Sequence, residues 1–148
     1  MKHPIDELFS VLVERGGSDL HLLEGQPPKI RRHGEVTAIG DSPLDRETIV
    51  RLLEPICSPP AWRKFTETGD LDFAYEMDEN NRFRCNFYKQ LHGYGAVFRI
   101  IPTKIKTLKE LGVPPVIESF GNYKSGLVLV TGPTGSGKST TLAAVVDS

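Results

Sequence analysis

Residues 126–146 read GLVLVTGPTGSGKSTTLAAVV, and this stretch decides the fold of the C-terminal part of the chain. Residues 127–130 are continuously apolar and include two valines, which is typical of a strand buried on both faces of a parallel sheet. A glycine-rich loop follows, and residues 140–146 look like the start of a helix. The order of strand, glycine-rich loop, lysine, serine and helix is that of the Walker A motif, so the sequence predicts a phosphate-binding loop (P-loop) here.

Each residue type in this loop suits a contact with a bound nucleotide. The glycines permit a sharp turn with positive φ, and without a Cβ they let backbone amides approach phosphate oxygens. The amides of residues 135–139 would form an anion-binding nest at a helix N-terminus, where the helix dipole favours negative charge. The residues predicted to bind the nucleotide are Gly132, Pro133, Thr134, Gly135, Ser136, Gly137, Lys138, Ser139 and Thr140.

Two of these side chains have further predicted roles. The ammonium of Lys138 would reach the β- and γ-phosphates, which makes Lys138 the predicted catalytic residue. The hydroxyl of Ser139 would ligate Mg²⁺ held by the nucleotide. The predicted cofactors are therefore ATP and Mg²⁺.

The residues before this region predict a separate α+β domain. Apolar residues recur at helical spacing over residues 5–13, and Asp45 is placed to cap a second helix. A third, short helix is expected near residues 61–67, after Pro59 and Pro60.

Strand patterns occupy the rest of this domain. A strand is expected near residues 20–23, and a tight hairpin is expected to join residues 29–32 to residues 35–39. The clearest alternation of apolar and polar residues predicts an antiparallel meander with one face packed on helices, formed by residues 71–77, 82–88 and 96–101.

We therefore divide the chain into three parts. Residues 1–101 form the α+β domain, residues 102–124 form a linker, and residues 125–148 begin a second domain. Within the linker, a short helix is expected over residues 108–117, interrupted by Pro114 and Pro115.

Composition narrows the class of protein. The 148 residues carry a net charge of -1, which argues against nucleic acid as the main partner. The two cysteines have no zinc-site spacing. The N-terminus has an acidic pair where a signal peptide needs an apolar run, and no stretch approaches the ~18 apolar residues of a membrane span. We expect a cytoplasmic protein without a transmembrane segment.

Several segments together resemble the secretion ATPase superfamily, whose members power type II secretion and type IV pili. They are SDLHL at residues 18–22, GQPP at 25–28, RFRCN at 82–86, AVFRIIP at 96–102 and the P-loop sequence. The resemblance extends over essentially the whole chain and is strongest to the pilus-retraction branch. Cys85 is a departure, because that branch usually has valine there, and it should affect packing only.

The resemblance implies a fold. A PAS-like N-terminal domain, with an antiparallel sheet and helices, would be followed by the first strand, the P-loop and the first helix of a RecA-like α/β NTPase domain. It also implies a homo-hexameric ring in which ATP lies between the two domains and arginines of the N-terminal domain approach its phosphates.

Three arginines are candidates for that role. Alternation places Arg82 and Arg84 on one face of a strand, and Arg99 on the next strand could join them. A solvated basic face of a one-sided sheet is the alternative interpretation.

The function implied by the resemblance is that of a motor ATPase that drives pilus retraction and twitching motility. It would act at the cytoplasmic side of the inner membrane, at the pilus base, with the inner-membrane platform protein and the pilus machinery as partners. The acidic and His-containing motifs that such a motor needs lie downstream, so we expect the 148-residue chain alone to be inactive. Two alternatives stay open. One is a pilus assembly or type II secretion ATPase of the same superfamily, and the other is a non-catalytic module for ring assembly and docking.

Overall fold

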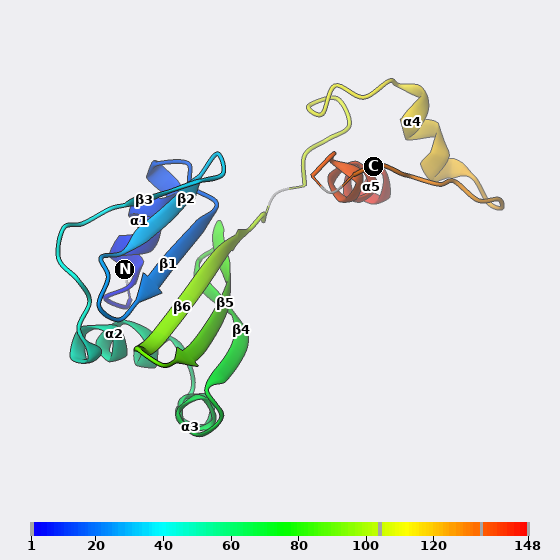
Figure 1. Cartoon of the computed structure of the whole chain (residues 1–148). Helices are drawn as coiled ribbons and strands as arrows, with labels where there is room; N and C mark the ends of the chain where they lie inside the picture. The colour runs from blue at the N-terminus through cyan, green and yellow to red at the C-terminus, as the bar shows by residue number, and fades with distance from the viewer. Residues whose placement is uncertain (1, 104, 134, 148) are drawn as a thin grey trace. The chain divides into compact units, whose positions relative to one another are not determined.

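The computed structural model describes residues 2–103, 105–133 and 135–147. The chain divides into two compact units, Met1–Pro102 and Thr103–Ser148 (Figure 1).

The first unit is built on a six-stranded antiparallel sheet with the strand order β3-β2-β1-β6-β5-β4. In chain order the strands are β1 (Asp19–Leu23), β2 (Lys29–Arg32), β3 (Glu35–Ala38), β4 (Asp70–Asp78), β5 (Asn81–Gln90) and β6 (Gly93–Ile101). The predicted hairpin is confirmed, with His33 and Gly34 at φ 50° and 84° in its two-residue turn. The predicted meander is β4-β5-β6. Together with the helices, the sheet confirms a mixed α+β domain.

Three helices cover the apolar side of this sheet. They are α1 (Asp6–Glu14), α2 (Arg46–Leu53) and α3 (Pro59–Thr68), and a short 3-10 helix, η1 (Glu54–Ile56), follows α2. Asp45 caps α2 as predicted, because its carboxylate accepts the amide of Thr48 at 2.7 Å. Phe9 of α1 stacks on Phe83 of β5 with ring centroids 4.1 Å apart, so the helix and the meander share one core.

The other side of the sheet carries polar side chains. Side chains alternate between the two faces of a strand, so burying Phe83, Cys85 and Phe87 turns the residues between them outward. The cross-strand register then aligns Arg31, Asp19, Arg99 and Arg84 in one row across β2, β1, β6 and β5. This row lies at the centre of the candidate site.

In the second unit the helices are α4 (Val116–Ser119), η2 (Phe120–Asn122) and α5 (Lys138–Asp147). The helix predicted over residues 108–117 is wrong in position. Residues 108–112 form turns, and α4 begins only after the two prolines, which disfavour helical geometry in the residue before them.

The strand predicted over residues 127–130 does not form within this chain. Leu127 and Leu129 are 81% and 75% exposed. A strand needs neighbours to receive its backbone hydrogen bonds, and the six-stranded sheet that the structure describes belongs wholly to the first unit. The expected RecA-like sheet therefore stays a prediction.

Candidate functional site

The predicted P-loop leads directly into α5, which begins at Lys138. Gly132, Gly135 and Gly137 have φ values of 152°, 82° and 91°, a region that side chains with a Cβ rarely occupy. A Cβ on Gly132 would also lie 2.8 Å from the hydroxyl oxygen of Ser136. The glycines at these positions are thus required by the backbone path that the loop takes.

Lys138 folds back over the loop. Its Nζ donates to the carbonyl oxygens of Gly132 and Pro133, both at 2.7 Å. The amide of Ser136 donates to the carbonyl of Pro133 at 3.2 Å, and the amide of Thr141 makes a helical bond to Gly137. An ammonium group and the first amides of a ten-residue helix therefore meet at one exposed loop, which is a chemical setting suited to an anion.

The other predicted loop residues lie as follows. Ser139 and Thr140 are exposed in the first turn of α5. Thr134 lies outside the described residues.

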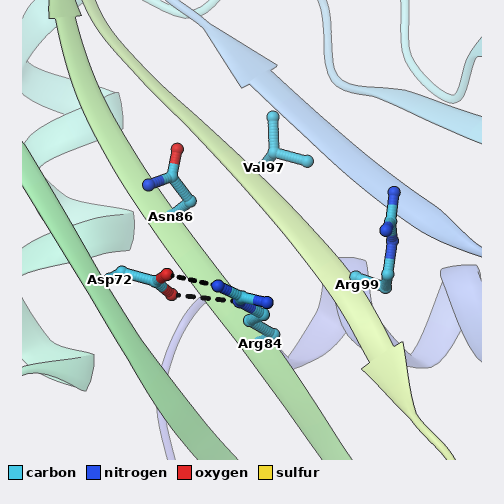
Figure 2. Close-up of a pocket in the computed structure, with 5 residues that line it drawn as sticks. All are labelled: Asp72, Arg84, Asn86, Val97 and Arg99. Carbon is cyan, nitrogen blue, oxygen red and sulfur yellow. Dashed lines mark hydrogen bonds and ion pairs between the residues drawn. The ribbon is translucent and has the colours of Figure 1, made fainter.

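A second polar site lies on the outward face of the six-stranded sheet. A pocket of about 370 Å³ is lined by Asp72 of β4, Arg84 and Asn86 of β5, and Val97 and Arg99 of β6 (Figure 2). The register pairs Arg84 with Arg99 directly across β5 and β6. Like charges placed opposite each other repel, so each arginine needs a compensating partner.

Arg99 has a buried partner. Its Nε donates to Asp19 Oδ1 at 2.8 Å, and the side chain of Asp19 is only 5% exposed. The Ser18 hydroxyl donates to the other carboxylate oxygen at 2.6 Å, and Arg31 Nε lies 3.9 Å from it. Burial alone would raise the pKa of Asp19, but the hydrogen bonds from Ser18 and Arg99 outweigh it and hold the pKa below the ordinary value.

Arg84 has an exposed partner. Its Nη2 and Nε contact the two carboxylate oxygens of Asp72 at 2.7 and 3.3 Å, shown as dashed lines in Figure 2. The hydrogen bond from Arg84 lowers the pKa of Asp72, so the carboxylate is ionised at neutral pH.

The three arginines singled out by the sequence are thus not equivalent. Arg84 and Arg99 line one pocket, whereas Arg82 lies beside Glu76, with 3.8 Å between Nε and Oε2, and does not line it. Asp19 and Asp72 are functional candidates that sequence reasoning missed. Both stand in segments already noted, SDLHL and the alternating strand of residues 71–77, but their arginine partners are distant in sequence.

His21 lies beside this row, opposite Val97 of β6 and Lys29 of β2. Its Nε2 is buried without a hydrogen-bond partner in the described part of the protein. Burial lowers the pKa of His21, and the neighbouring Asp19 only partly opposes this, so the imidazole is neutral at pH 7.

Among the described residues, no group of three or more histidine, cysteine or acidic side chains is arranged to hold a metal ion. No described helix combines the length and the apolar composition that crossing a membrane requires.

Comparison with known proteins identifies the family. A family model described as "Type II/IV secretion system protein" matches residues 5–148. The chain belongs to this family. The superfamily expected from the sequence is thereby confirmed.

Individual relatives agree with this membership. The type IV pilus retractation ATPase PilT of Pseudomonas aeruginosa is 46% identical over 143 residues, which are 97% of this chain and 42% of that protein. The type IV pilus ATPase PilU of the same organism is 36% identical over 95% of this chain and 37% of its own length. A crystal structure of the pilus retraction motor PilT with bound ADP aligns with a TM-score of 0.82 and 38% identity, covering 95% of this chain and 41% of that one. The chain thus spans less than half the length of these relatives.

The buried carboxylate of Asp19 leads to a pH prediction. Its pKa is lower in the folded than in the unfolded protein, so its stabilising contribution is complete above the unfolded pKa of about 3.9 and is lost as the pH falls through the folded pKa. We expect Asp19→Asn to lower the urea midpoint at about pH 6 and to lower it less at about pH 3. Fluorescence of Trp62, the single tryptophan, which packs against the core of the first unit, reports the midpoint. An equal midpoint difference at both pH values would contradict the prediction.

Proposed function

We propose that this chain is the ATP-binding part of a hexameric motor ATPase that powers type IV pilus retraction. The observation that carries the proposal is the loop of residues 132–140, in which three left-handed glycines precede a helix that begins at Lys138. Family membership and the names of the relatives support the motor role. In this proposal the loop amides and Lys138 bind the phosphates of ATP, and Ser139 ligates Mg²⁺.

The contact that Lys138 makes in this structure fits such a role. Its ammonium is held by two backbone carbonyls, and carbonyl oxygens compete only weakly with a polyphosphate for a cation. A nucleotide phosphate would therefore draw Nζ away from Gly132 and Pro133. The proposal assigns the lysine to charge stabilisation, and the attacking water would be oriented by other groups.

The sheet pocket completes the proposal. Arg84 and Arg99 have exposed guanidinium groups, 68% and 71% by side chain, and their planar donor sets match phosphate oxygens. We propose that in the assembled ring they approach the nucleotide phosphates. Arg82 does not line the pocket, so the pocket gives no support to a phosphate contact by Arg82.

The proposed cellular setting follows the same relatives. The ring would act at the cytoplasmic face of the inner membrane, at the pilus base, against the platform protein of the pilus machinery.

Replacing Lys138 with alanine tests the nucleotide site. We expect the affinity of the chain for a fluorescent ATP analogue with Mg²⁺ to fall at least about tenfold, because a charge-assisted phosphate contact is lost. Lys109→Ala is the matched control, since Lys109 is exposed in the same unit and its loss changes the net charge equally. Equal affinities of the two variants would count against the site.

A chimera tests the retraction role. The segment of Pseudomonas aeruginosa PilT that aligns with this chain is replaced by residues 1–148, and twitching zones are measured in a strain that lacks PilT. We expect twitching to be restored, and we expect the chimera with Lys138→Ala to restore none. A chimera that is expressed and binds ATP but leaves cells piliated and immobile would contradict retraction.

A further inference from the structure

The two arginines of the sheet pocket are held by carboxylates in very different environments. The side chain of Asp19, which holds Arg99, is 5% exposed, whereas that of Asp72, which holds Arg84, is 44% exposed. Both contacts join one arginine to one aspartate on the same face of the same sheet. The difference in burial therefore points to different tasks for the two acids.

Asp72 occupies the edge of Arg84 that an oxyanion would use. The contact is side-on and bidentate: Nε donates to one carboxylate oxygen and Nη2 donates to the other. A phosphate group binds a guanidinium through the same pair of parallel hydrogen bonds. Arg84 therefore cannot give this edge to a phosphate until Asp72 leaves it.

The position of Asp72 makes such an exchange feasible. Both partners are solvent-exposed, and exposed ion pairs are weak and screened by salt. Asn86 lies directly opposite Asp72 in the register and Arg99 opposite Arg84, so an anion that displaced the carboxylate would find further donors in the pocket.

Asp19 is suited to a fixed support. Its carboxylate is buried and also accepts the Ser18 hydroxyl at 2.6 Å, so it has no solvated position to move to. It engages Arg99 through Nε, a contact that does not require the two terminal nitrogens. In Figure 2 the guanidinium of Arg99 extends away from Arg84 and its aspartate.

We propose that Asp72 is an internal competitor that masks Arg84 until a phosphate oxyanion displaces it, and that Asp19 is a positioning residue that holds Arg99 in place as part of the same pocket. This inference rests on the proposed function, in which these arginines meet nucleotide phosphates. It predicts that two Asp→Asn changes, identical in charge, act in opposite directions.

The test is a pyrophosphate titration of the ¹⁵N-labelled 148-residue chain, followed at the Nε–Hε signals of Arg84 and Arg99. Every variant also carries Lys138→Ala, so that binding at the loop does not contribute. Asp72→Asn is expected to tighten binding about two- to fivefold, the range set by the strength of an exposed ion pair. Asp19→Asn is expected to weaken binding by about threefold or more and to shift the Arg99 signal before any anion is added.

Glu76→Gln is the matched control for Asp72→Asn. Glu76 is an exposed acid on the same strand and face, but it lies beside Arg82, outside the pocket. Removing the charge of Glu76 strengthens the general electrostatic attraction for an anion, as removing the charge of Asp72 does. The two variants therefore differ only in whether Arg84 is unmasked. If Asp19→Asn loses the dispersed spectrum of the fold, Arg99→Lys takes its place, because lysine keeps the charge but lacks Nε.

Three results would overturn the inference. They are equal affinities for Asp72→Asn and Glu76→Gln, tighter binding by Asp19→Asn, and an Arg84 signal that pyrophosphate does not move in Asp72→Asn. Because the signals are read at the arginines in a chain without Lys138, each of these results leaves the separate test of the nucleotide loop intact.

Discussion

β1 pairs with β6 through five residue pairs, from Asp19 opposite Arg99 to Leu23 opposite Gly95, and this pairing joins two groups of strands that are far apart in the sequence. One group is the β1-β2-β3 hairpin region, and the other is the β4-β5-β6 meander. Without the pairing, neither group would bury a complete apolar face, and Asp19 would not reach Arg99. The fold of the first unit and the chemistry of its outward face therefore depend on the same strand contact.

The aromatic core fixes the register of that contact. Phe9 stacks on Phe83 and meets Phe98 edge-on at 5.0 Å, so the inward residues of β5 and β6 have set positions. Because side chains alternate along a strand, a slip of one residue would turn Phe98 outward and Arg99 into the core. The free energy that opposes such a slip comes from the buried face. Packing of the buried face therefore fixes the positions of the charged residues on the outward face, and these residues need not stabilise the register themselves.

Local patterns predicted most of the first unit. Alternation located the meander, Asp45 marked the start of α2, and His33-Gly34 marked a turn, because each signal depends on residues close together in the sequence. The partnership of Asp19 with Arg99 joins residues 80 positions apart, and no periodic pattern reports it. The sequence also predicted the same role for Arg82 and Arg84. Spacing along one strand cannot show that Arg82 lies beside Glu76 while Arg84 lines the pocket.

In the second unit, a local sequence pattern predicted a strand that the structure does not contain. Residues 127–130 have strand composition and form no strand, because a strand requires partners that composition cannot supply. The predicted P-loop needs fewer partners, since its turn is set by glycine geometry and by the start of α5. The turn can therefore be predicted from a short motif, whereas the RecA-like sheet expected beside it stays a prediction.

A crystal structure with a non-hydrolysable ATP analogue and Mg²⁺ would show whether residues 132–140 bind nucleotide phosphates. We expect phosphate oxygens within hydrogen-bond distance of the amides of residues 135–139, with Lys138 Nζ moved from the carbonyls of Gly132 and Pro133 onto the β- and γ-phosphates. A nucleotide bound elsewhere, with Lys138 still on those two carbonyls, would contradict this expectation.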